Sequence, residues 1–252
     1  MKIAIVTGAT SGVGLSFLKA WQEKNEHFDE VWLVARHEAA LQALANKLPW
    51  RSRCFPIDLS DTQQRTMLFQ ALHEARPQVR YLVNAAGYGK FGRVEEIASV
   101  EQLGMVHLNC TALLDLCHRT LPFLARGSVV YNIASVAAFM PQPNFAVYAA
   151  SKSFVLSFSR AFHTENKKRG IRVIAVCPNP MATQFFERAG CVPKGFKRLG
   201  FEKVEDVVAK AIENAEKGKD ISINCWSAKA LYVASKIVPQ RVQMAAQQIF
   251  IR

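Results

Sequence analysis

The stretch "KIAIVTGATSGVG", residues 2–14, decides how the chain begins to fold. Its opening residues are almost continuously apolar, which is typical of a strand buried on both faces of a sheet. Gly8, Gly12 and Gly14 allow tight backbone geometry, and residues 13–25 then repeat apolar side chains at helical spacing. The helix that follows the turn would direct unpaired N–H groups at a bound phosphate. This stretch therefore predicts a nucleotide-binding strand–turn–helix unit, although its GxxxGxG spacing is not the commoner GxGxxG.

The rest of the chain alternates strand-like and helix-like stretches in the same way. We expect strands at residues 2–6, 30–35, 52–57, 79–84, 128–134, 171–177 and 220–225. We expect helices at residues 13–25, 38–48, about 61–75 with Ser60 as N-cap, about 100–123, 147–169 and 204–216. Apolar strands separated by helices predict a doubly wound α/β fold, with a parallel sheet of about seven strands and helices on both faces. We expect a single domain over residues 1–252.

Composition and charge narrow the functional classes. The 252 residues are half hydrophobic, and the net charge of +12 favours anionic partners. The basic residues are scattered in short runs such as 167–169, which are common on solvated faces, so we expect no nucleic-acid partner. None of the six cysteines has zinc-site spacing, which predicts no bound metal and a reducing cytoplasmic location. No run of about 18 apolar residues predicts a membrane span.

Polar residues with possible chemical roles follow the later strands. "NAAG" at residues 84–87 follows the fourth strand, Asn109 lies on the next helix, and Ser135 ends the fifth strand. Tyr148 and Lys152 in "YAASK" are four residues apart, so they are neighbours on one helix face. A nearby ammonium favours the phenolate and would lower the pKa of the tyrosine. This pair could therefore donate or accept a proton.

These motifs, in this order after the glycine turn, resemble those of the short-chain dehydrogenases/reductases. The resemblance extends from residue 1 to about residue 185. It implies that Tyr148 is the general acid/base, that Ser135 binds the carbonyl oxygen, that Lys152 holds the nicotinamide ribose, and that Asn109 anchors a water relay. The resemblance also implies cofactor contacts from Thr7, Gly8, Ser11, Gly12, Val13, Gly14, Arg36, Asp58, Leu59, Asn84, Ala85, Ala86, Gly87, Tyr148, Lys152, Pro178, Met181 and Thr183.

Each motif has a structural alternative. A Tyr/Lys pair on a helix is most often a packing pair, Ser135 could cap a strand end, and Asn109 could be a buried polar group satisfied by the backbone. Asn84 is expected to tie strands together rather than to touch substrate. The agreement of five motifs favours the catalytic interpretation of Ser135, Tyr148 and Lys152.

The end of the second strand carries the choice of cofactor. In "LVARHE", Ala35 stands where an NAD-type acid would bind the ribose hydroxyl, and Arg36 follows. An arginine can pair with the 2′-phosphate of NADP, so we expect NADP(H) rather than NAD(H). The alternative is that Arg36 only ends the strand. Asp58 resembles the acid that the family uses to bind adenine.

The resemblance weakens after the sixth strand. Pro178 and Thr183 match, and Thr183 is expected to reach the nicotinamide amide, but Asn179 replaces the usual glycine. Residues 184–201 are rich in phenylalanine and lysine and predict a substrate lid, or else a segment that packs against the C-terminal helices. Residues 227–252 predict a helical extension split by Pro239.

The sequence predicts an oxidoreductase that moves hydride between NADP(H) and a small carbonyl or alcohol substrate, in a homodimer or homotetramer. A catalytically idle nucleotide sensor or scaffold of the same fold is the main alternative. An RNA-binding protein and a sugar-nucleotide epimerase are weaker ones, since neither explains the tyrosine motif and the chain length together.

Overall fold

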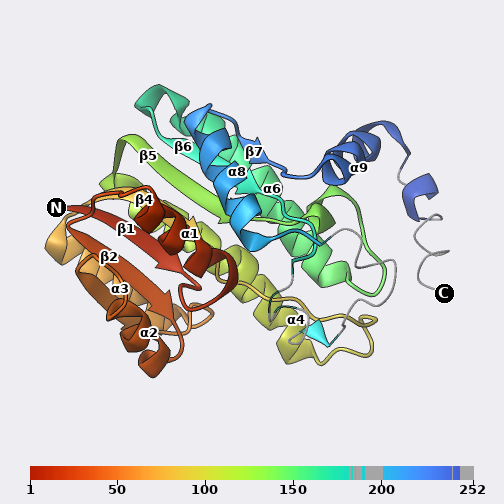
Figure 1. The fold of residues 1–252 in the computed structure, drawn as a ribbon. Helices are drawn as coiled ribbons and strands as arrows, with labels where there is room; N and C mark the ends of the chain where they lie inside the picture. The colour runs from red at the N-terminus through yellow and green to blue at the C-terminus, as the bar shows by residue number, and fades with distance from the viewer. Residues whose placement is uncertain (182, 184, 186–188, 191–200, 240, 245–252) are drawn as a thin grey trace.

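The computed structural model describes residues 1–181, 183, 185, 189–190, 201–239 and 241–244. Its centre is a parallel sheet in the order β3-β2-β1-β4-β5-β6-β7, which confirms the expected fold class (Figure 1). The strands are β1 Lys2–Thr7, β2 Glu30–Ala35, β3 Ser52–Pro56, β4 Gln78–Asn84, β5 Leu124–Ile133, β6 Arg172–Val176 and β7 Ile221–Ser222. Each lies within a few residues of the stretch that the sequence predicts.

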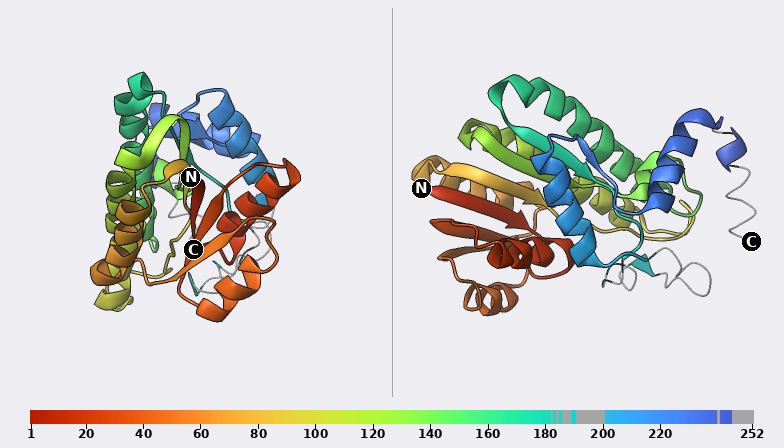
Figure 2. Two further views of the ribbon diagram at one scale, coloured as in Figure 1. Left: turned by 90° about the vertical axis from the view of Figure 1, so that its left-hand side faces the viewer. Right: turned by 45° about the horizontal axis from the view of Figure 1, so that its top comes forward.

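Helices cover both faces of the sheet (Figure 2). One face carries α1, α2 and α8, and the other carries α3, α5 and α6. The helix bounds are α1 Gly12–Glu23, α2 Glu38–Ala45, α3 Thr62–Ala75, α4 Ser99–Val106, α5 Leu113–Thr120, α6 Ala146–Asn166, α8 Val204–Glu216 and α9 Trp226–Ile237. Because the strands are covered on both sides, their near-continuous apolar sequences are buried.

Strand β1 lies where the chain changes direction across the sheet. It pairs with β2 on one side and with β4 on the other, so the chain winds first outward and then back past β1. The loops after β1 and β4 leave the same edge in opposite directions, which opens a crevice at the carboxyl ends of the strands. The fold therefore places the glycine turn and the "NAAG" loop at one site.

The region expected as one long helix at 100–123 has a different internal form. Between α4 and α5, residues His107–Ala112 form a π-helical turn, η1, and Leu121–Phe123 form a short 3₁₀ turn, η2. A π turn inserts an extra residue and often marks a functional position. Asn109 lies within η1, and the apolar periodicity of the sequence gives no sign of this turn.

The N-cap predicted for α3 is wrong by one residue. Asp61 is the N-cap, and its carboxylate accepts hydrogen bonds from the backbone N–H groups of Gln63 and Gln64. Ser60 instead donates its hydroxyl to the Asp58 carboxylate, at 2.6 Å. Serine and aspartate are both good N-caps, so residue type does not distinguish Ser60 from Asp61.

The C-terminal segment is helical on both sides of Pro239 within the described residues, with α9 before it and residues 241–244 after it. Most of the predicted lid at 184–201 lies outside the described residues, apart from Phe185, Ala189, Gly190 and Phe201. Searched over the described residues, the chain has no helix both long and apolar enough to cross a membrane.

Candidate active site

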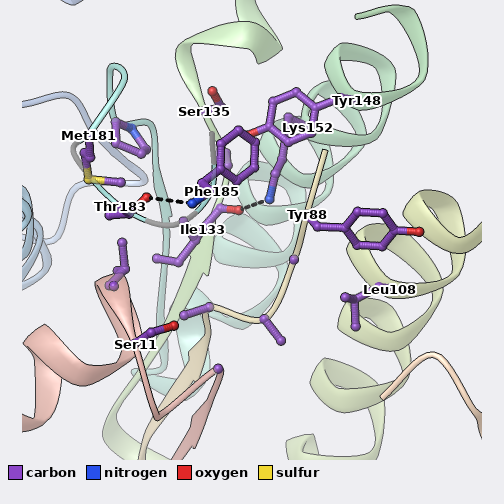
Figure 3. Close-up of a pocket in the computed structure, with 18 of the residues that line it drawn as sticks. Ser11, Tyr88, Leu108, Ile133, Ser135, Tyr148, Lys152, Met181, Thr183 and Phe185 are labelled. Atoms are coloured by element: carbon purple, nitrogen blue, oxygen red, sulfur yellow. Dashed lines mark hydrogen bonds between the residues drawn. The ribbon is translucent and has the colours of Figure 1, made fainter. Parts of the chain in front are cut away.

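A cleft of about 1420 Å³ opens at the carboxyl ends of the strands. Its walls come from the turn after β1, the ends of β2 and β5, the loop after β4, and α6. Figure 3 shows Ser11 at one end, with Ser135, Tyr148 and Lys152 toward the other. Most of the sequence-predicted site residues line it: Gly8, Ser11, Gly12, Val13, Arg36, Asp58, Leu59, Ala85, Ala86, Gly87, Ser135, Tyr148, Lys152, Pro178, Met181 and Thr183.

The glycine turn has the backbone geometry that glycine alone adopts easily. Gly8 and Gly12 have φ values of 62° and 53°, in the left-handed region. A Cβ on Gly14 would lie 2.5 Å from the Gly8 carbonyl oxygen, so only a hydrogen fits there. Ser11 is the N-cap of α1 but makes no capping hydrogen bond with its side chain. The first turn of α1 therefore faces the cleft with N–H groups suited to a phosphate, and the cradle fits the pyrophosphate of a dinucleotide.

We expect Gly14→Ala to weaken binding of NADPH by about tenfold or more, because the added methyl must displace the backbone at Gly8 and with it the phosphate cradle. Titration of the protein's fluorescence with NADPH measures this. Glu23→Ala, at the exposed end of the same helix, is the matched control and should bind normally. Normal NADPH affinity in a folded Gly14→Ala variant would mean that the turn does not hold the cofactor.

Four sequence-predicted residues stand behind the cleft wall rather than on it: Thr7, Gly14, Asn84 and Asn109. The Thr7 hydroxyl accepts hydrogen bonds from the N–H groups of Ala85 and Ala86, at 3.0 and 3.1 Å. It thereby fixes the loop after β4 against the end of β1. Its role in this structure is to position the wall.

Asn84 is also a buried residue that ties elements together. Its amide donates to the side-chain oxygen of Asn132 on β5, at 2.8 Å, and Asn132 donates to Ser159 on α6. The side-chain oxygen of Asn84 has no hydrogen-bond partner among the described residues. This network fits the expected strand-tying role of Asn84.

Tyr148 and Lys152 are presented by α6 and are both buried, at 6% exposure each. The Tyr148 ring stacks on Phe145 with centroids 4.3 Å apart, and Phe185 packs against it at 5.3 Å. The Lys152 ammonium donates to the carbonyl oxygen of Ile133 at 2.8 Å (Figure 3). It lies 5.7 Å from the centroid of the Tyr148 ring. Helical spacing and the end of β5 thus hold both groups on one wall.

The electrostatic balance at Tyr148 differs from the expected one. Burial raises the pKa of Tyr148 to about 12, while a hydrogen bond with Ser135 acts in the opposite direction. Burial also lowers the pKa of Lys152 to about 8. Removal from water is therefore the largest cause of both pKa shifts, and it opposes the charged form of each group. Tyr148 is a protonated phenol in the protein without a cofactor.

The low pKa of Lys152 predicts a pH-dependent stability. An unfolded lysine titrates near 10.5, so between pH 8 and 10.5 the unfolded chain binds more protons than the folded one, and the free energy of unfolding rises with pH. The penalty is full below pH 8. Lys152→Met removes the cost of burying the charged ammonium. The free energy of unfolding of the variant minus that of wild type should therefore be about 2 kcal/mol smaller at pH 10 than at pH 7. Urea unfolding at both pH values measures this difference, and Lys168→Met, at an exposed lysine, is the control. A difference between variant and wild type that stays the same at pH 7 and pH 10 would contradict the prediction.

Asn109 is positioned by the π turn η1. Its amide donates to the carbonyl oxygen of Tyr88 and to the hydroxyl of Ser151, at 2.9 and 3.0 Å, and its oxygen accepts from the Tyr88 N–H. A Cβ on Gly87 would lie 2.9 Å from that oxygen and 3.4 Å from the Lys152 nitrogen. Asn109 and Lys152 therefore approach the same point of the loop from two sides.

Sequence reasoning missed two aromatic residues of the cleft. Tyr88 lines it and donates its hydroxyl to the Glu101 carbonyl, and Phe145 lines it beside Tyr148. Gly89 leaves room for Phe145 and Tyr148, because a Cβ there would lie 2.7 Å from the Tyr148 ring and 3.0 Å from the Phe145 ring. The only sequence signal was their nearness to the "NAAG" and "YAASK" motifs.

The other end of the cleft carries Arg36 and Asp58. Arg36 is exposed, directly follows β2, and makes no ion pair within the described part of the chain. Asp58 accepts hydrogen bonds from the N–H and hydroxyl of Ser60. A cation without a carboxylate partner is suited to an anionic group in the cleft.

Comparison with known proteins agrees with this geometry. The profile of the short chain dehydrogenase family matches residues 2–190. Sulfoacetaldehyde reductase 2 of Chromohalobacter salexigens is 31% identical, over 73% of this chain and 74% of that protein. The probable short-chain type dehydrogenase/reductase VdlC of Helicobacter pylori is 28% identical, over 94% and 82%.

A solved structure shares the fold. It is a short-chain dehydrogenase from Sphingobium yanoikuyae in complex with NADPH, with a TM-score of 0.79, 25% identity and coverage of 96% of this chain and 95% of that one. The match of the family profile spans the whole cleft-forming part of the sheet. The chain therefore belongs to the short-chain dehydrogenase/reductase family, whose members oxidise hydroxyl groups or reduce carbonyl groups with a nicotinamide cofactor.

Proposed function

We propose that the protein is an NADP(H)-dependent oxidoreductase that interconverts a small carbonyl compound and its alcohol. The observation that carries this proposal is the meeting of Ser135, Tyr148 and Lys152 on one wall of a cleft whose other end is a glycine cradle. The idle-sensor alternative predicts a broken set of these three residues, and the set is complete.

Tyr148 moves the proton in the proposed reaction. Because burial keeps it protonated, its hydroxyl can donate to a carbonyl oxygen as that oxygen gains charge during reduction. Ser135 donates a hydrogen bond to the same oxygen and fixes the carbonyl group. The reduced nicotinamide, when bound, supplies the hydride to the carbonyl carbon. In alcohol oxidation the proton transfer runs in reverse, so Tyr148 must begin as the phenolate and then accepts the proton of the alcohol hydroxyl.

Lys152 and Asn109 orient the groups around this tyrosine. Of the three N–H donors on Lys152, one is used by the Ile133 carbonyl, which leaves others for the ribose of the nicotinamide. Asn109 holds the backbone of Tyr88 beside Lys152, where a water chain to the lysine can end. At the far end, Arg36 would pair with the 2′-phosphate, which favours NADP(H).

The direct test is a panel of ketones and aldehydes scored by loss of NADPH absorbance, run in parallel with NADH. Turnover of at least one carbonyl compound, with a higher kcat/KM for NADPH than for NADH, is the expected result. Tight NADPH binding without turnover of any carbonyl or alcohol would favour the idle sensor. Equal use of the two cofactors would contradict the role of Arg36 in selecting NADP(H), but not the proposed oxidoreductase activity.

A further inference from the structure

Helix α9 turns a row of apolar side chains to solvent. Trp226, Val233 and Ile237 are 81%, 54% and 75% exposed, and Ala230 lies exposed between them. At 3.6 residues per turn these four positions fall on one face, which we call the α9 stripe. Single exposed apolar residues are common, but a continuous row rimmed by polar residues marks an interaction surface.

The opposite face of α9 holds the helix on the body of the protein. Ala228 is buried, and the Tyr232 ring packs against Phe139 with centroids 5.0 Å apart. After Pro239 the chain folds back, and the Gln243 amide donates to the carbonyl oxygens of Ser235 and Val238. The helix is therefore anchored, and Figures 1 and 2 show it at one end of the molecule, beyond the sheet.

The charges around the α9 stripe have one sign. Lys229 and Lys236 are exposed along one edge of it, and neither makes an ion pair within the described residues. The Lys236 ammonium lies over the Tyr232 ring at 5.5 Å. The sequence after Asp220 contains four basic residues and no aspartate or glutamate. An apolar row with a tryptophan at one end and lysines along its edge is suited to the boundary between lipid head groups and acyl chains.

We propose that the α9 stripe docks on an anionic lipid surface. The apolar side chains would enter the head-group region, and Lys229 and Lys236 would lie against the lipid phosphates. Helix α9 packs on the turn Val136–Phe139, and Val136 and Ala137 of this turn line the cleft. Docking of α9 would therefore hold that side of the cleft near the lipid. This proposal does not depend on the substrate or on the preferred cofactor.

A second copy of the chain fits the stripe less well. A helix of this length is about 18 Å long, and a stripe about 10 Å wide covers roughly 200 Å², whereas a stable interface buries about 800 Å² on each partner. A symmetric contact would also place the stripe against itself, so Lys229 and Lys236 would face the same lysines. The net charge of +12 adds to this repulsion.

The test is co-sedimentation of the whole protein with vesicles of phosphatidylglycerol and phosphatidylcholine, compared with vesicles of phosphatidylcholine alone. We expect binding to the anionic vesicles that weakens as salt is raised. Tryptophan emission should shift to the blue on binding, since Trp226 is exposed whereas Trp21 and Trp32 are buried and Trp50 is half-buried. Absence of preferential binding to anionic vesicles would overturn the proposal.

Two variants locate the contact. Val233→Ser with Ile237→Ser removes apolar contact, and Lys229→Glu with Lys236→Glu reverses the edge charges; each should weaken vesicle binding by about tenfold or more. The matched controls are Met67→Ser with Val94→Ser, which are similarly exposed, and Lys167→Glu with Lys168→Glu.

Equal loss in the variants and their controls would show nonspecific attraction and overturn the proposal. The molecular mass in lipid-free solution tests the other occupant. If the Val233→Ser, Ile237→Ser variant has a lower mass than wild type, the stripe binds a second copy of the chain, and the lipid proposal is overturned.

Discussion

Tyr148→Phe should lower turnover by about 10²–10⁴-fold, the usual effect of a positioned acid/base. The substitution removes the phenolic proton that the proposed mechanism donates to the carbonyl oxygen. It keeps the ring, which stacks on Phe145 and contacts Phe185. Binding of NADPH should therefore change little. Steady-state rates with the best carbonyl of the panel and NADPH titration of the same preparation measure both quantities.

Tyr88→Phe is the matched control, because it removes another phenolic hydroxyl from the same cleft. The Tyr88 hydroxyl donates to the carbonyl of Glu101 and has no place in the proton transfer. We expect its variant to keep turnover within a few-fold of wild type. Turnover of Tyr148→Phe near that of the control would remove Tyr148 from the mechanism, whatever happened to stability.

The parts of the fold that the sequence predicts are those set by burial and by local geometry. Strands covered on both faces must be apolar along their whole length, so β1, β2 and β4 are visible as runs of hydrophobic residues. The glycine turn is visible because a Cβ on Gly14 has no room beside the Gly8 carbonyl. Burial and local geometry restrict which residue types are allowed at nearby positions, so their effects can be recognised in the sequence.

The cleft depends on contacts between distant segments, and these are harder to predict. Asn109 is directed by a π turn that leaves the apolar pattern of the helix almost unchanged. Phe145 stacks on Tyr148 only because α6 begins beside the loop after β4, where Gly89 leaves room for both rings. The motif residues could be named in advance, but Tyr88 and Phe145 beside them could not.

The expected lowering of the tyrosine pKa shows the same limit. Helical spacing correctly places Lys152 beside Tyr148, yet spacing says nothing about how deeply the pair is buried. Both groups are withdrawn from water, and burial moves the pKa of Tyr148 to about 12 and that of Lys152 to about 8. Desolvation disfavours the charged form of each group, so it raises the pKa of Tyr148 and lowers that of Lys152. Attraction between an ammonium and a phenolate would shift each pKa in the other direction.

Ala35→Asp with Arg36→Leu should reverse the proposed cofactor preference. A carboxylate at the end of β2 repels a 2′-phosphate and can accept a hydrogen bond from a free 2′-hydroxyl, while the loss of Arg36 removes the cation that would pair with the phosphate. A charge-assisted pair contributes about 1.5–3 kcal/mol. The ratio of the NADPH and NADH dissociation constants should therefore change by about 10²-fold or more.

The control for this double variant is Arg51→Leu, which removes an exposed arginine at the other end of the β2–β3 pair. It lowers the net charge as Arg36→Leu does, but far from the strand end that carries Arg36. The double variant lowers the net charge by two and Arg51→Leu lowers it by one. If general attraction between a basic protein and an anionic cofactor set the preference, the Arg51 variant would therefore lose about half as much NADPH binding free energy as the double variant. A loss confined to the double variant, with NADH affinity improved, would assign the choice to the end of β2, where Arg36 lines the cleft and makes no ion pair within the described residues.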